Sequence, residues 1–252
     1  MTLSDFLELT QATQSPLSLV HCTTVDQGVQ MLASGELRPT HCGVYDDDLL
    51  YLFYGRPAYK PAERAGASYM VELAPMCLVL KPSLLASARR SLPFDSGGFS
   101  RYENLIGRGL SRQDFELSGD ETAPSRLVTA FYGNNRNYYE QLPLQQPQFD
   151  VSRRTARALA RLISDTSIRN DDDRCGTIEV QFSQPIRIAE ALQAIVAPAA
   201  MLADPEVQRI LEASPDAIPL AYKIYGRFNP ANYASAIYER VEQVLEGQGA
   251  FA

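Results

Sequence analysis

The sequence of 252 residues contains no apolar run that approaches the roughly 18 residues needed for a membrane-spanning helix. Its first residues, MTLSDF, lack the basic and apolar regions of a secretory signal peptide. Four cysteines without close spacing do not indicate a disulfide framework. The formal net charge of −7, from 23 Lys plus Arg against 30 Asp plus Glu, argues against binding duplex DNA or anionic membranes by bulk charge. We therefore expect a soluble, acidic, cytoplasmic protein with no membrane partner.

Several motifs that carry known chemistry are also missing. There is no GxGxxG after a strand, no GxxxxGK[ST], no HExxH and no GxSxG. Two His-Cys pairs, His21-Cys22 and His41-Cys42, suggest zinc at first sight. Adjacent residues of an extended strand point to opposite faces, however, and no Cys-x-x-Cys spacing supports chelation. We therefore expect no metal site.

What is present predicts an α+β fold, because short strands alternate with helices in no regular βαβ order. One domain over residues 1–252 is expected. Strands are predicted over residues 17–22, 49–54, 76–80 and 177–182. Helices are predicted from the N-cap Ser4 to Ser15, from Asp26 to Gly35, and over residues 153–163, 189–194, 205–211 and 230–245. The segment from Pro93 to about Asp120 has no clear period, which predicts a functional loop or lid.

Two residues at strand ends are candidates for ligand contact. His21 closes the first predicted strand just before a helix, where backbone amides and a side chain can meet a ligand. The alternative is a half-buried histidine bonded to the backbone. Arg56 follows the aromatic strand in YLFYGRPAY, and its planar donors suit a phosphate group. The alternative there is an aromatic core strand that ends in a surface arginine.

Glu179 is the most informative residue of the chain. It lies in the strand TIEVQF, whose alternation places Ile178, Val180 and Phe182 on one face and Thr177, Glu179 and Gln181 on the other. A carboxylate in the middle of an apolar strand either faces solvent on an edge strand or serves a polar cleft. If the strand is central, a functional carboxylate is indicated.

Together these blocks resemble the ADP-ribosyltransferase superfamily, and within it the DarT-type branch, whose known members modify single-stranded DNA. Val20-His21-Cys22-Thr23 is similar to the His-x-Thr block that ends the first strand of that branch, and Gly35-Glu36-Leu37 to the turn after its first helix. Leu52–Pro57 is similar to its Phe-Tyr-rich strand with the arginine that contacts NAD. Arg174–Val180 is similar to the strand with its catalytic glutamate.

The resemblance implies a split, mixed or antiparallel sheet with flanking helices, and an enzyme that uses NAD as a substrate without a metal. Glu179 and Arg56 are the implied catalytic residues. The implied NAD-binding residues are His21, Thr23, Tyr54, Arg56 and Tyr59, with Tyr54 or Tyr59 stacking on nicotinamide. The resemblance also implies a toxin or defence effector, for which an antitoxin is the expected partner.

The acceptor and two rival functions stay open. The rivals are an RNA 2′-phosphotransferase-like enzyme and a binding or interaction module that kept the fold without the chemistry. Single-stranded DNA or RNA as acceptor would need basic and aromatic side chains around the site. The candidates are Arg89, Arg90, Arg101, Arg108, Arg112, Arg153, Arg154 and Arg157, with Phe99, Tyr102, Tyr138 and Tyr139 as stacking platforms.

Overall fold

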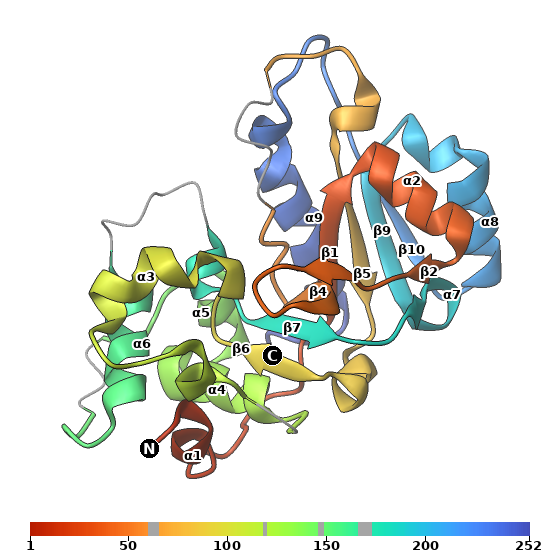
Figure 1. The fold of residues 1–252 in the computed structure, drawn as a ribbon. Helices are drawn as coiled ribbons and strands as arrows, with labels where there is room; N and C mark the ends of the chain where they lie inside the picture. Colours follow the sequence, from red (N-terminus) through yellow and green to blue (C-terminus); the bar gives the residue numbers. More distant parts are fainter. Residues whose placement is uncertain (60–65, 118–119, 146–148, 166–172) are drawn as a thin grey trace.

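A computed structural model describes residues 1–59, 66–117, 120–145, 149–165 and 173–252, and it confirms the α+β fold. The strands are β1 (Leu19–Thr24), β2 (Glu36–Leu37), β3 (Thr40–Cys42), β4 (Asp47–Tyr54), β5 (Pro75–Leu80), β6 (Arg90–Leu92), β7 (Glu179–Phe182), β8 (Ile186–Arg187), β9 (Leu192–Pro198) and β10 (Ile218–Tyr222). One eight-stranded sheet has the order β10-β9-β5-β1-β4-β7-β6, with β3 paired to β4 (Figure 1). The β9–β10 pair is parallel, and the other pairs are antiparallel.

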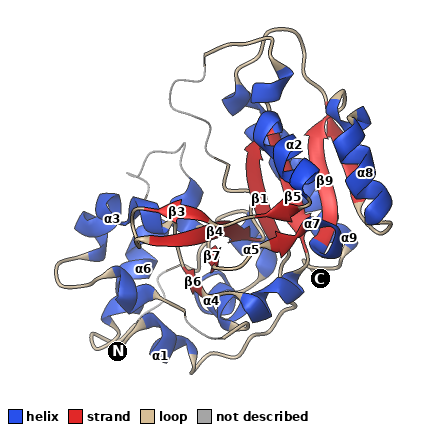
Figure 2. Cartoon of the chain, turned by 45° about the vertical axis from the view of Figure 1, so that its right-hand side comes forward, coloured by secondary structure: helices blue, strands red, loops and turns tan. Residues whose placement is uncertain are grey.

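Helices surround this sheet (Figure 2). They are α1 (Leu3–Leu7), α2 (Val25–Ser34), α3 (Phe99–Ile106), α4 (Ala123–Tyr132), α5 (Asn135–Tyr139), α6 (Arg154–Ser164), α7 (Ile188–Ala191), α8 (Pro205–Ala213) and α9 (Ala234–Gly247). Helices α2, α8 and α9 accompany β1, β5, β9 and β10, whereas α1 and α3–α6 gather on the side of β6 and β7 (Figure 1). Strand β4 lies between β1 and β7, and so connects β1, β5, β9 and β10 with β6 and β7.

The sheet divides at β1. Strand β4 is registered with β1 at two pairs, Leu19 with Tyr54 and Val20 with Phe53. Strand β1 then continues along β5 as far as Thr24, while the remainder of β4 pairs with β3 and β7. His21 is therefore the first residue of β1 past the point where β4 leaves it.

The predicted helix that ends at Gly35 is confirmed, with a different N-cap. Thr24, not Asp26, caps α2, since its side chain accepts a hydrogen bond from the Gln27 N–H. Gly35 ends the helix at φ +74°, a left-handed conformation in which glycine has no Cβ penalty.

Two predicted helices need correction. The first helix begins after Thr2, not Ser4, because Thr2 and Asp5 form a reciprocal capping box, and it ends at Leu7. Residues 189–194 are not one helix, since α7 ends at Ala191 and β9 starts at Leu192. An apolar run of this length fits a buried strand as well as a helix, and pairing with β5 and β10 decides it.

The segment from Pro93 to Asp120 is not the long loop that its composition predicted. Its described residues form a 3-10 turn at Ser96–Gly98, the helix α3 and a second 3-10 turn at Arg112–Phe115. The rings of Phe94 and Phe115 are buried, with centroids 5.3 Å apart. Burial of these rings makes the segment part of the hydrophobic core.

Three observations concern membrane spans, metal sites and disulfides, none of which the sequence indicated. No helix in the described ranges is both long and apolar enough to cross a bilayer. Within the same ranges no group of three or more His, Cys, Asp or Glu side chains is placed to hold a metal ion. All four cysteines are free thiols.

Candidate functional site

Glu179 occupies a central position in the sheet. It pairs with Phe53 of β4 on one side and with Leu92 of β6 on the other. Gln181, two residues further along β7, pairs with Tyr51 and Arg90 and so shares the face of Glu179. The alternative of an edge strand with a solvated carboxylate is thereby wrong, since Glu179 is only 1% exposed.

Both carboxylate oxygens of Glu179 accept hydrogen bonds. The Ser96 N–H donates to Oε2 over 3.2 Å, and the Gln181 amide donates to Oε1 over 2.6 Å. The Gln181 amide also donates to the Ser96 hydroxyl over 3.3 Å. Ser96 lies in the 3-10 turn capped by Asp95, so the segment expected to be a loop supplies one wall of the site.

Burial raises the pKa of Glu179 from 4.5 to about 7. The hydrogen bonds from Gln181 and Ser96 oppose this rise, and the nearby charge of Asp95 adds to it. Desolvation is the largest cause, because removing water destabilises the ionised carboxylate much more than the neutral carboxylic acid. Near neutral pH both the protonated and the ionised form of this carboxyl are therefore populated, as general acid–base chemistry requires.

Tyr45, in the turn between β3 and β4, lies beside Glu179 and faces the Ser96 and Gln181 side chains. The guanidinium carbons of Arg90 and Arg112 lie 4.4 Å and 5.0 Å from the centroid of its ring. Arg90 also forms an ion pair with Glu116 at 3.0 Å. Burial raises the pKa of the Tyr45 hydroxyl, so it remains a donor at neutral pH.

Some buried polar atoms of this region have no protein hydrogen-bond partner in the described part of the chain. Around Glu179 they are Gln181 Oε1, Tyr45 Oη and Arg112 Nη1, and His21 Nε2 is a further one at the point where β4 leaves β1. Most buried polar atoms in folded proteins are paired, and leaving one unpaired costs free energy. Donors and acceptors collected in this way around a carboxyl group are the pattern of a ligand-binding site.

The His21 side chain contacts the backbone of β4 at Tyr51. Its Nδ1 lies 3.1 Å from the Tyr51 carbonyl oxygen, where β4 has left β1. Burial lowers the pKa of His21, although the bond to Tyr51 opposes this, so the ring is neutral at pH 7. This is the half-buried, backbone-bonded histidine of the alternative interpretation, and its buried Nε2 has no hydrogen-bond partner among the described residues.

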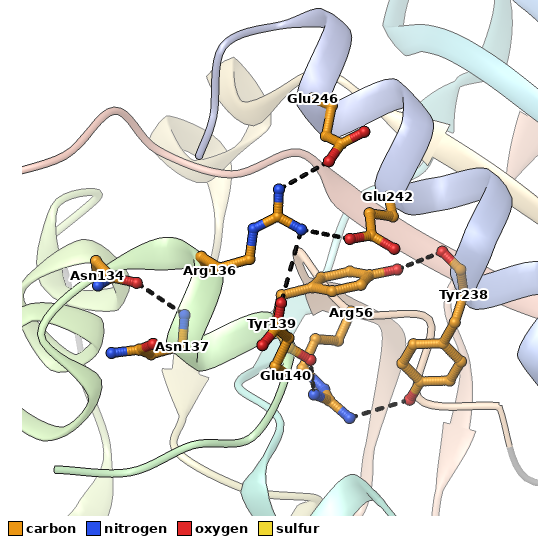
Figure 3. Close-up of polar contacts among 9 residues, drawn as sticks. All are labelled: Arg56, Asn134, Arg136, Asn137, Tyr139, Glu140, Tyr238, Glu242 and Glu246. Atoms are coloured by element: carbon orange, nitrogen blue, oxygen red, sulfur yellow. Dashed lines mark hydrogen bonds and ion pairs between the residues drawn. The ribbon is translucent and has the colours of Figure 1, made fainter. Parts of the chain in front are cut away.

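Arg56 is buried among other residues than those around Glu179, so the alternative of a surface arginine is wrong and the two implied catalytic residues share no contact among the described residues. Its side chain is 3% exposed and donates to the Tyr139 carbonyl oxygen and to the Tyr238 hydroxyl (Figure 3). It also donates to the Tyr138 carbonyl oxygen. The guanidinium lies 5.2 Å from the centroid of the Tyr238 ring. Arg56 therefore joins α5 to α9, and none of these contacts is shared with Glu179.

The other expected NAD-binding residues divide into buried and partly exposed ones. Tyr54 has no exposed surface, and its hydroxyl accepts from the Leu17 N–H at 2.9 Å and pairs with the Ser125 hydroxyl at 2.8 Å. No ligand can stack on its ring, so this assignment is wrong. Thr23 is mostly buried and bonds to Gln27 at 2.5 Å, whereas Tyr59 is half-buried.

The expected nucleic-acid platforms are largely in the core. Tyr102, Tyr138 and Tyr139 are each 5% exposed or less, so they are not surface stacking platforms, and Phe99 is half-buried. Among the arginines, Arg89 pairs with Asp47, Arg101 lies 3.9 Å from Asp95, and Arg153 covers the ring of Phe6. Arg108, Arg154 and Arg157 line a separate pocket, described below.

Sequence reasoning missed Tyr45, Ser96 and the pairing of Gln181 with Glu179. Only Gln181 carried a signal, since it lies two residues from Glu179 on the same strand face. Neither a comparison with protein-family models nor one with curated proteins finds a match to this chain. The resemblance to ADP-ribosyltransferases therefore stays a prediction from the sequence.

Proposed function

We propose that the chain is an NAD-dependent ADP-ribosyltransferase with Glu179 as its catalytic residue. The observation that carries the proposal is the buried carboxyl group with a pKa of about 7, held by two donors beside polar atoms that lack protein partners. The sequence blocks around His21 and Glu179 supply the reaction class. When the bond from ribose to the positively charged nicotinamide ring breaks, positive charge develops on the ribose. A carboxylate in a water-poor site stabilises that charge.

In the proposed reaction the bond between ribose C1′ and the nicotinamide nitrogen breaks, and neutral nicotinamide leaves. Positive charge develops on the ribose, and ionised Glu179 stabilises it. A bond then forms between C1′ and a nucleophilic atom of the acceptor, whose proton passes to the Glu179 carboxylate or to solvent. The Ser96 N–H and the Gln181 amide hold the carboxylate oriented while the charge develops.

Other side chains of the site provide binding groups. The neutral Nε2 of His21 and the Gln181 carbonyl oxygen suit ribose hydroxyl groups, and Arg112 suits a phosphate. Arg56, implied by the resemblance as catalytic, is here a positioning residue that orders α5 and α9. Tyr45 lies beside Glu179 and contacts Arg90 and Arg112, so the proposed reaction requires this ring to move when NAD reaches the buried carboxylate.

The acceptor in this proposal is a macromolecule, and single-stranded DNA or RNA is the first to test. The proposed biological role is that of an effector with an antitoxin.

The protein is incubated with NAD labelled on the adenylate, and the label is followed into DNA, RNA and proteins of a lysate. Glu179→Gln is expected to lower transfer by at least about 10²-fold, the scale of one lost transition-state contact. Glu212→Gln, a change of an exposed glutamate on α8, serves as the matched control. Equal transfer by Glu179→Gln and the control would contradict the proposal.

A second candidate is supported by the burial of Arg56 and Glu179, which are 3% and 1% exposed. It is a binding module of this fold that keeps nucleotide affinity and has no transferase activity. The two candidates differ in one measurement, since a module binds NAD without releasing nicotinamide. The same assay with 2′-phosphorylated RNA as acceptor covers the phosphotransferase alternative.

A further inference from the structure

A pocket of about 300 Å³ opens between α3 and α6, on the side of the molecule away from β10 (Figure 1). Four arginines line it: Arg108, Arg154, Arg157 and Arg161. Ile106 and Leu110 add apolar surface. This four-arginine pocket contains none of the residues placed around Glu179.

The arginines converge for a local reason. Spacings of three and four residues place Arg154, Arg157 and Arg161 on one face of α6. The opposite side of the helix is buried, with Leu159 and Leu162 in the core. Arg154 donates to the Arg108 carbonyl oxygen over 3.2 Å, which anchors the loop after α3 to the helix.

The charge of the pocket is uncompensated within the described ranges. Asp150 and Asp165 flank α6 in the sequence, but no ion pair joins a described carboxylate to any of the four arginines. Elsewhere Arg90, Arg126 and Arg136 are each paired with carboxylates. In a protein with seven more acidic than basic residues, four clustered cations repel one another and attract anions.

We propose that the four-arginine pocket binds a small organic phosphate with two or more negative charges, such as a nucleoside diphosphate, at a site separate from Glu179. Planar guanidinium groups match phosphate oxygens with paired donors. The apolar surface of Ile106 and Leu110 receives the organic part, and the volume lies at the lower end of small-molecule pockets, about 300–1,000 Å³. A compact pocket in a protein of net charge −7 suits a small anion better than an extended polyanion, which needs a long basic groove.

Isothermal titration of the full chain with ADP at low salt tests this assignment, with inorganic phosphate and a single-stranded 20-mer oligonucleotide as comparison ligands. The double variant Arg157→Gln/Arg161→Gln removes two charges and keeps the helix propensity of both positions. The single variant Arg161→Gln changes only one exposed residue. Arg240→Gln, a change of a partly exposed arginine of α9 outside the pocket, is the control. Thermal unfolding of each variant checks that it is folded.

We expect ADP to bind, with an affinity that falls as salt is added, and to lose at least tenfold (about 1.4 kcal/mol) in the double variant but not in Arg240→Gln. Glu179→Gln should bind ADP in the pocket as the unmodified protein does, so this inference and the proposed transferase activity fail separately. Absence of ADP binding, or binding unchanged in the folded double variant, overturns the proposal. Inorganic phosphate binding as tightly as ADP, or an oligonucleotide binding far more tightly, also overturns it.

Discussion

Replacing Glu179 by glutamine should change how the stability of the protein depends on pH. The glutamate is nearly completely buried, and its pKa is raised from 4.5 to about 7. The folded protein therefore holds this proton at pH values where the unfolded chain has released it. Stability from this group is present at low pH and is lost as the pH rises through the interval between the two pKa values.

The size of the effect follows from the shift. Each pKa unit corresponds to about 1.36 kcal/mol, so ionising Glu179 in the folded state costs about 3 kcal/mol in total, of which about 2.5 kcal/mol falls between pH 5 and pH 8. Glutamine cannot ionise and retains a carbonyl oxygen for the Ser96 N–H. The free energy of unfolding of Glu179→Gln, relative to the unmodified protein, should therefore rise by about 2.5 kcal/mol from pH 5 to pH 8.

Urea unfolding at pH 5, 6, 7 and 8 measures this difference, and the other titrating groups cancel because both proteins share them. Glu212→Gln, on the exposed side of α8, should stay parallel to the unmodified protein throughout. If the difference between Glu179→Gln and the unmodified protein is also constant over this range, burial does not raise the pKa of Glu179, and the reasoning is refuted.

Three further predictions concern Glu179, Tyr45 and Tyr54. ADP-ribosyl transfer should increase with pH through about 7, as Glu179 ionises, and a profile that is flat from pH 6 to 8 would contradict its role. Tyr45→Ala should let water reach Glu179 and lower its pKa, so the midpoint of that profile should move to lower pH; an unmoved midpoint means that Tyr45 does not shield the carboxyl. Tyr54→Phe leaves the buried Leu17 N–H without its acceptor, which should cost about 1–3 kcal/mol in urea unfolding, while NAD affinity stays the same. A loss of NAD affinity would return Tyr54 to the ligand site.

Local periodicity predicted the elements near Glu179 well. The alternation in TIEVQF placed Glu179 and Gln181 on one face, and β7 has that arrangement. Local periodicity also predicted α6, in which the buried residues and the arginines lie on different faces of the helix. In both cases a single segment carries the whole pattern, so no distant contact is needed to decide it.

Where the prediction failed, the deciding contacts join distant segments. Arg56 ends an aromatic strand, and nothing nearby in the sequence shows that α5 and α9 enclose its guanidinium. Tyr45 lies in a turn, and only the pairing of β3 with β4 carries it to Arg90 and Arg112. Segment 93–120 lacks a period because its short helices bury separate aromatic residues instead of one continuous stripe.

One hydrogen-bonding arrangement connects α5, which contacts Arg56, with the strand that carries Glu179. Beyond the pair of Phe53 with Glu179, the Tyr54 N–H still donates to the Ile178 carbonyl oxygen. The Tyr138 hydroxyl then takes the place of the next ladder bond, donating to the Tyr54 carbonyl oxygen at 2.8 Å and accepting from the Ile178 N–H at 3.0 Å.

A side chain of α5 thus protects a backbone amide next to the candidate catalytic residue. Exchange of the Ile178 amide hydrogen with solvent deuterium requires Tyr138 to move away, even when β4 and β7 remain together. The exchange rate at this one amide is consequently a measure of how often α5, the helix that carries the Arg56 contacts, detaches from the strand that carries Glu179.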